Sequence, residues 1–362
     1  MKPARYNTIM PRIAIEHQKL IHIDDIMFLI GKNFNEILSF LKTTAYGETI
    51  PGDIQGLEKA YVLLEELLYE NYALTFHQLL QYSSDYIASF LRSLLYRFDS
   101  SNLKTILRMV NSGIPSDLIL KNLIPLGGYS KKRCRVILSG VKSMSDFINS
   151  LSDQDFGFFL RDKIKVHPTY PELSLLEAFI EKEAFRRIFE EIAKLDRNDK
   201  KIATKIIGIE IDVLNVKIIL KCKAVGINDE KIQEYLMPVG LLDDILLKSA
   251  ITQPDIKSAF QVIFKGIEPE HQIYQNFFLK LVLEADKPIS HLESFLDRIS
   301  LEMSLFELKK NMRYYNIAYI LAFLNLKWTE IKNLRCVINA AARNVFDPTQ
   351  DLLIITENYN KM

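Results

Sequence analysis

DSSNLKTIL (residues 99–107) carries an acid, an asparagine, a basic residue and an apolar residue at offsets 0, 3, 5 and 8. The same skeleton recurs as DVLNVKIIL (212–220) and, more loosely, as EIKNLRCVI (330–338). Self-similarity at a long fixed period indicates duplicated structural units. The asparagines of the three copies are 113 and then 118 residues apart, at Asn102, Asn215 and Asn333.

The likeness extends beyond the motif itself. A shift of 113 residues superimposes the first copy on the second without a gap for about 29 residues, and Gly113, Pro125 and Gly127 then fall on Gly226, Pro238 and Gly240. Upstream, Leu41, Tyr46 and Gly47 match Leu151, Phe156 and Gly157 at a shift of 110. We therefore predict three similar helical domains, with bounds 1–113, 114–228 and 229–362.

Helical periodicity dominates the chain. Apolar residues recur every three to four positions in segments 56–98, 172–195 and 276–310. Alternating patterns bounded by Asn-Gly or Asp-Gly turns are missing, and only 13 glycines and 12 prolines interrupt the 362 residues. The sequence predicts an all-α fold with long helices and short connections.

Each motif copy is expected to fold as a helix with one apolar face. Leu103, Ile106 and Leu107 share that face, and Asp99 lies on the same side. A buried carboxylate needs partners, so we expect the acid to accept free N–H groups of a neighbouring helix start and the asparagine to bridge a second segment. The basic residue points away from the apolar face, towards an interior wall or a domain junction. The predicted fold-specifying residues are Asp99, Asn102, Lys104, Asp212, Asn215, Lys217, Glu330, Asn333 and Arg335.

The ends of the motif helices are predicted by one position. Gly113, Gly226 and Asn344 each stand eleven residues after a motif asparagine. Glycine and asparagine are the residues that tolerate a left-handed conformation just past a helix end. Each motif helix is therefore expected to end directly before this position.

Candidate reactive groups are few. No motif copy has a histidine, a serine nucleophile or a metal-ligand set beside it, and neither a P-loop nor a dinucleotide-binding glycine motif occurs. We predict no cofactor, no metal and no catalytic residue. The segment LGGYSKKRCR (126–135) leaves two interpretations open: an anion-binding loop, or a turn followed by a solvated basic helix face.

The composition limits the classes of partner and the cellular environment that the sequence supports. The 46 basic and 45 acidic residues give a net charge of +1, which offers no electrostatic basis for binding nucleic acid. Three widely spaced cysteines favour reduced thiols in an intracellular protein. The longest apolar runs, 208–220 and 314–328, are shorter than the roughly 18–20 residues of a membrane span.

The motifs taken together resemble a known family. LKTTAYGETI (41–50), YRFDSSNLKTIL (96–107), EIDVLNVKIILKCKAVG (210–226) and IAYILAFLNLKWTEIKNLRCVI (317–338) follow one another in the order and spacing found in that family. The chain resembles the C subunit of prokaryotic A/V-type rotary ATPases, whose eukaryotic counterpart is the V-ATPase d subunit. The resemblance covers about residues 5 to 345.

This resemblance implies a funnel of three helical domains around a pseudo-threefold axis. It implies a non-catalytic rotor subunit of the central stalk, which links proton or sodium transport to ATP synthesis or hydrolysis. The implied partners are the central shaft subunits D and F and the membrane rotor ring of proteolipid c-type subunits. The implied location is the cytoplasmic face of the cell membrane, as a peripheral part of the complex.

Two other interpretations stay open from the residues alone. A generic all-α helical-repeat scaffold would also be built of repeated units, although the 34–47-residue periods of tetratricopeptide and HEAT proteins are not found. An all-α enzyme without recognisable motifs is the other. An extended shape would favour the scaffold, and strong thermal stabilisation by a nucleotide or metal would favour the enzyme.

Overall fold

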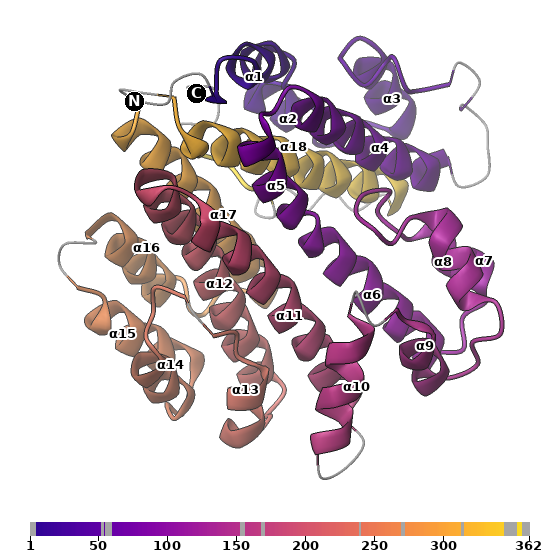
Figure 1. Ribbon diagram of the computed structural model, residues 1–362. Coiled ribbons are helices and arrows are strands. Elements are labelled where there is room, and N and C mark those ends of the chain that lie inside the picture. The colour runs from indigo at the N-terminus through magenta and orange to yellow at the C-terminus, as the bar shows by residue number, and fades with distance from the viewer. Residues whose placement is uncertain are drawn as a thin grey trace. The chain divides into compact units, whose positions relative to one another are not determined.

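The computed structural model describes residues 5–51, 54, 60–152, 156–167, 171–238, 240–268, 272–312, 315–343 and 353–356. Eighteen helices and no strand occur in these residues (Figure 1), which confirms the predicted all-α class. Asn344 lies outside the described residues. No helix in the described ranges is long and apolar enough to cross a membrane.

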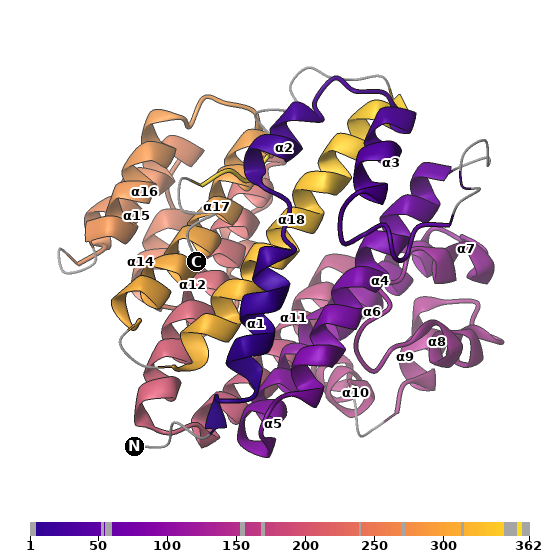
Figure 2. The same cartoon turned by 90° about the horizontal axis from the view of Figure 1, so that it is seen from above.

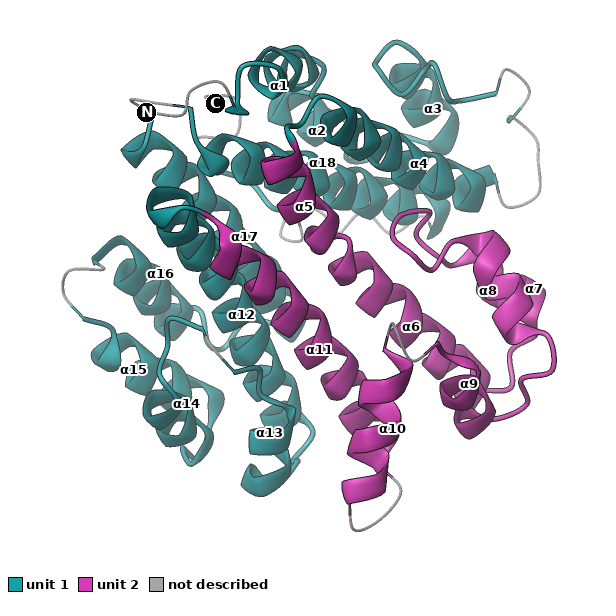
Figure 3. Ribbon diagram, viewed as in Figure 1, with its two compact units in different colours: residues 1–84, 196–362 teal, residues 85–195 magenta. Residues whose placement is uncertain are grey.

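The chain divides into two compact units, coloured separately in Figure 3. Unit 2 is residues 85–195, and unit 1 combines residues 1–84 with residues 196–362. Each unit is described by itself below.

Unit 2 is built on two long helices, α6 (Tyr96–Asn111) and α11 (Leu173–Lys194), which pack side by side. Its core combines residues of α6, of α11 and of the segment between them, from Leu103 to Ala184. The remaining helices of unit 2 are α5 (Asp85–Leu94), α7 (Ser116–Lys121), α8 (Lys131–Leu138), α9 (Met144–Ser150) and α10 (Gly157–Val166).

Unit 1 repeats this plan with α12 (Arg197–Ala224) and α17 (Ile289–Lys310), again two long helices in contact. One core of unit 1 lies within this stretch, from Ile209 to Met303. The shorter helices between α12 and α17 are α13 (Asp229–Tyr235), α14 (Asp244–Ile251), α15 (Ile256–Gly266) and α16 (Gln272–Leu283).

The same plan occurs a third time in unit 1, but here the two ends of the chain supply it together. The long helix α18 (Ile317–Arg343) packs on α4 (Ala60–Gln81), which comes from the opposite end of the sequence. In Figure 2, α1 runs alongside both of these helices. The shorter N-terminal helices are α1 (Ile9–Gln18), α2 (Ile23–Phe28) and α3 (Phe34–Lys42).

Local sequence signals explain several helix ends. Ser130, Asp243 and Asn33 each accept a hydrogen bond from a first-turn amide of the helix that follows. Gly113 and Gly226 have φ of 67° and 73°, and each follows the C-cap residue of α6 or α12. The amide of the next residue then reaches back five residues, at 2.9 Å in both helices, which is the Schellman pattern. The predicted left-handed position is thus confirmed at both glycines.

Candidate functional site

The asparagine of every motif copy is buried and exchanges two hydrogen bonds with the backbone of one distant residue. Its amide group donates to the carbonyl oxygen of that residue, and its side-chain oxygen accepts from the amide of the same residue. A buried loop amide and carbonyl are thereby both satisfied without a β-ladder. The three pairs, with these two distances, are Asn102–Ile124 (2.9 and 2.8 Å), Asn215–Met237 (3.0 and 2.7 Å) and Asn333–Ile354 (3.0 and 2.8 Å).

The acid of every copy is buried one turn before the asparagine and accepts backbone N–H groups. The donor residue stands directly before the N-cap of a short helix, which is α8, α14 or α2. The helix starts themselves are capped by other side chains, so the acid fixes the chain one residue earlier than expected from the sequence. The contacts are Tyr129 to Asp99 (3.0 Å), Leu241 and Leu242 to Asp212 (3.0 and 3.1 Å) and Ile21 to Glu330 (2.5 Å).

We call each acid, its asparagine and the backbone they hold a clamp. The three clamps differ in one aromatic neighbour. Tyr274 donates its hydroxyl to Asp212 at 3.0 Å, and Tyr46 donates to Glu330 at 2.5 Å. Phe156, 110 residues after Tyr46 and 118 before Tyr274, has no hydroxyl. It packs against the ring of Tyr129, with the ring centroids 6.2 Å apart.

The third clamp also contains a buried cation. Lys327 donates to Glu330 at 2.8 Å and to the Tyr46 hydroxyl at 3.0 Å, and its ammonium lies 4.3 Å from the centre of the Tyr46 ring. The side chains of Lys327 and Glu330 are only 4% and 0% exposed. A pair buried this deeply depends on full hydrogen bonding, because removal of either partner would leave an uncompensated charge.

The second clamp contains an acid with a raised pKa. Burial raises the pKa of Asp212 to about 7, and hydrogen bonds from Leu242, Tyr274 and Leu241 act in the opposite direction. Burial, together with the adjacent Asp212 carboxylate, raises the pKa of Tyr274 well above its usual value. The clamp therefore encloses a titratable group whose contacts are two backbone amides and one phenol.

Two glycines make room for the acids. A Cβ atom at Gly127 would lie 2.4 Å from Oδ1 of Asp99, and one at Gly240 would lie 1.9 Å from Oδ1 of Asp212. Real Cβ contacts are never that short, so both positions need a residue without a side chain. These are two of the residues that coincide in the sequence repeat, and the close approach to the carboxylate gives their physical reason.

The basic residue of each motif forms an ion pair with the long helix that packs on it. In unit 2 the pair joins α6 to α11, and in unit 1 the pairs join α12 to α17 and α18 to α4. The acids at 65, 181 and 297 are 116 residues apart in both intervals, a regularity that the motif comparison alone does not reveal. The pairs are Lys104–Glu181 (2.5 Å), Lys217–Asp297 (2.9 Å) and Arg335–Glu65 (3.4 Å).

Asp297 connects three helices of unit 1. Besides Lys217 of α12, it pairs with Lys332 of α18 at 3.2 Å. Burial works against the charged carboxylate, yet Lys332 and Lys217 together hold the pKa of Asp297 below its usual value. Burial also lowers the pKa of Lys217. Through Asp297, Lys217 is thus linked to a helix outside its own pair.

Groups with catalytic potential are sparse. Among the residues that the structure describes, no three His, Cys, Asp or Glu side chains lie together as metal ligands would. All three cysteines are free thiols. Burial raises the pKa of Cys134 to about 12 and also raises those of Cys222 and Cys336. These thiols are therefore protonated and poorly nucleophilic at neutral pH.

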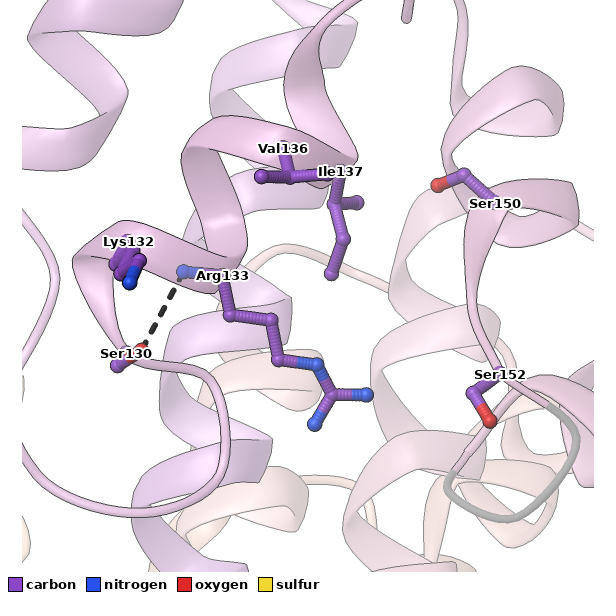
Figure 4. Close-up of a pocket in the computed structure, with 7 residues that line it drawn as sticks. All are labelled: Ser130, Lys132, Arg133, Val136, Ile137, Ser150 and Ser152. Carbon is purple, nitrogen blue, oxygen red and sulfur yellow. Dashed lines mark hydrogen bonds between the residues drawn. The ribbon is translucent and has the colours of Figure 1, made fainter.

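The basic segment 126–135 forms a turn followed by a short helix. Gly127 is a turn residue with φ of 96°, and α8 begins at the Ser130 cap. A surface depression of about 490 Å³ lies beside this helix (Figure 4). Its lining residues are Ser130, Lys132, Arg133, Val136, Ile137, Ser150 and Ser152.

The amino-acid sequence that folds into these clamps can be compared with those of known proteins. A family model described as ATP synthase (C/AC39) subunit matches residues 9–347. The chain belongs to this family. The resemblance noted in the sequence is thereby confirmed.

Three relatives match this chain along nearly its full length. The C subunit of the A-type ATP synthase of Methanocaldococcus jannaschii is 23% identical, covering 94% of this chain and 84% of the relative. The same protein of Methanococcoides burtonii is 22% identical, covering 94% and 92%. That of Archaeoglobus fulgidus is 24% identical, covering 92% and 91%.

The family match includes all nine predicted motif residues, from Asp99 to Arg335. It also includes Tyr46, Phe156 and Tyr274 and the three acids that pair with the motif cations. Ile354, the partner of Asn333, follows the matched range. The third clamp therefore depends on a segment beyond the region that the family model matches.

Proposed function

We propose that this chain is the non-catalytic central-stalk subunit of an A/V-type rotary ATP synthase or ATPase. It would connect the shaft subunits D and F to the membrane rotor ring of proteolipid c-type subunits, on the cytoplasmic face of the cell membrane. Rotation passed through it would link proton or sodium transport to ATP synthesis or hydrolysis. The family match over residues 9–347 and the relatives from A-type ATP synthases support this proposal.

The observation that carries the proposal is the threefold recurrence of the clamp without a reactive group. Asn102, Asn215 and Asn333 make the same two bonds, and all three are at most 1% exposed. A catalytic acid needs access to a substrate, whereas these acids face backbone amides. Repeated, saturated polar contacts are what a part that transmits torque needs, because they resist sliding of one segment past another.

We propose module bounds that follow the hydrophobic cores. The cores from Leu103 to Ala184 and from Ile209 to Met303 extend across positions 113 and 228, the predicted domain boundaries. A module would therefore begin before its motif helix and end with the long helix paired to it. The modules would be residues 85–195, residues 196–310, and residues 315–356 together with 5–84. A pseudo-threefold funnel of these modules remains our proposal for the assembled protein.

Co-purification tests the function directly. A chromosomal affinity tag on this chain is used to isolate complexes from detergent-solubilised membranes of the native host, with an unrelated tagged protein as control. We expect the shaft subunits and the rotor ring to elute with one copy of this chain per complex. Elution of the chain alone, or with proteins that belong to no rotary ATPase, would refute the proposal.

A further inference from the structure

The helix that follows the clamped residue differs sharply in charge between the three modules. The clamped residues Ile21, Tyr129 and Leu242 are each followed by a short helix, α2, α8 or α14. Helix α2 reads IDDIMF and α14 reads DILLKSAI, whereas α8 reads KKRCRVIL. Equivalent places in the modules thus have one purely basic helix, with four cations and no acid.

The fold uses only part of α8. Cys134 and Leu138 are buried in the unit 2 core. Arg133 contacts the loop that precedes α8: it donates to the Gly128 carbonyl at 3.2 Å, and its guanidinium lies 4.6 Å from the centre of the Tyr129 ring. Three side chains of α8, those of Cys134, Leu138 and Arg133, thus have contacts within unit 2.

Lys132 and Arg135 are the basic residues left to solvent. Both are exposed, and neither has an ion pair within the residues that the structure describes. Val136, the next residue, is 71% exposed. Two unpaired cations beside an exposed aliphatic side chain form a small surface with mixed character, which we call the α8 face.

A depression lies next to the α8 face and shares residues with it. Lys132, Arg133, Val136 and Ile137 line it on the α8 side, and Ser150 and Ser152 line it from α9 and the residues after it. In Figure 4 the Arg133 side chain extends across the depression towards Ser152. Cations and hydroxyl groups here offer donors to carboxylate oxygens, and Val136 and Ile137 offer an apolar contact.

We infer that the α8 face docks an acidic segment of a partner protein. Carboxylates of that segment pair with Lys132 and Arg135, and an apolar side chain between them covers Val136 and the depression. Nucleic acid would need a larger basic surface than one two-turn helix in a chain of net charge +1. Insertion into a bilayer would need more exposed apolar area than this helix presents. The inference goes beyond the proposed function and does not depend on which protein supplies the segment.

Site-specific photocrosslinking in the native host tests this inference. Benzoylphenylalanine replaces Val136, and the control position is Val166, which is 72% exposed at the end of α10 in the same unit. We expect position 136, and not 166, to crosslink to one protein, through a segment with two or more Asp or Glu residues within a helical turn. Lys132→Glu with Arg135→Glu should lower the yield about tenfold or more, since like charges would then oppose each other.

A matched variant separates this effect from net charge. Lys121→Glu with Lys165→Glu makes the same charge change at exposed positions elsewhere in unit 2 and should leave the yield unchanged. No protein adduct, an adduct to a segment without acids, or insensitivity to the α8 reversal would overturn the inference. Binding of the purified chain to phosphatidylglycerol vesicles that the α8 reversal abolishes would overturn it in favour of a membrane. An acidic segment from outside any rotary ATPase would support docking and contradict the proposed function.

Discussion

Gly127 and Gly140 give an internal comparison for the first clamp. Both lie in unit 2 with φ of 96° and 95°, so alanine meets the same backbone strain at either position. A Cβ at Gly140 would have nothing within 4 Å, whereas a Cβ at Gly127 would lie 2.4 Å from Oδ1 of Asp99. We expect Gly127→Ala to be much more destabilising than Gly140→Ala.

The expected magnitudes follow from this geometry. A non-glycine residue in the left-handed region costs roughly 1–2 kcal/mol, and both variants lose this amount. In Gly127→Ala the Asp99 carboxylate must also move away from the Tyr129 amide, from which it accepts a hydrogen bond of 3.0 Å. Loss of a buried hydrogen bond to a charged group costs about 1.5–3 kcal/mol. The free energy of unfolding should therefore fall by about 2.5–5 kcal/mol for Gly127→Ala and by about 1–2 kcal/mol for Gly140→Ala.

Urea denaturation followed by circular dichroism measures both losses. Hydrogen exchange of the Tyr129 amide reports the broken contact itself, and its protection should fall in Gly127→Ala only. In an Asp99→Ala background the extra loss should disappear, because the carboxylate that clashes is absent. Equal losses for the two glycine variants, or an extra loss that persists without Asp99, would show that the clamp does not explain the glycine.

Three further outcomes are expected. Asn333→Ala removes both hydrogen bonds to Ile354, so it should lower the free energy of unfolding by about 2–4 kcal/mol. In limited proteolysis of this variant, the C-terminal segment should be the first to be cleaved. An unchanged order of cleavage would count against the third clamp. Lys104→Glu should destabilise unit 2 by about 1 kcal/mol, since its ion pair with Glu181 is about four-fifths buried. The double variant Lys104→Glu with Glu181→Lys should restore most of the lost stability. If the effects of the two single substitutions simply add in the double variant, the two side chains do not interact. Burial raises the folded-state pKa of Asp212 from 3.8 to about 7, so the stability linked to its proton is present below about pH 4 and is lost as the pH rises to about 7. In urea titrations the stability of wild type relative to Asp212→Asn should fall over that range, and a constant difference would mean that Asp212 is not titrating there.

The sequence predicted much of the clamp because its parts are local or glycine-dependent. The offsets of Asp99, Asn102 and Lys104 on one helix are short-range, and the glycine past the helix end follows from backbone sterics. Helix content follows from apolar periodicity. These features need no knowledge of which segments meet in space.

Other parts could not be predicted because they depend on tertiary contacts. Glu65, Glu181 and Asp297 lie on helices that carry other acids as well, and only the packing of the long helices selects them as partners. The third clamp combines Ile21 and Ile354, which come from opposite ends of the chain. A comparison of consecutive repeats along the sequence therefore does not find all of its parts. Lys327 is a typical surface residue by composition, and only its contacts with Tyr46 and Glu330 explain its burial.

A reconstruction of the intact membrane complex by electron cryomicroscopy tests the central claim most directly. We predict one copy of this chain between the shaft and the ring, with Asn102, Asn215 and Asn333 related by successive rotations near 120° about the shaft axis. A copy bound away from that axis, or asparagines unrelated by such a rotation, would contradict the account.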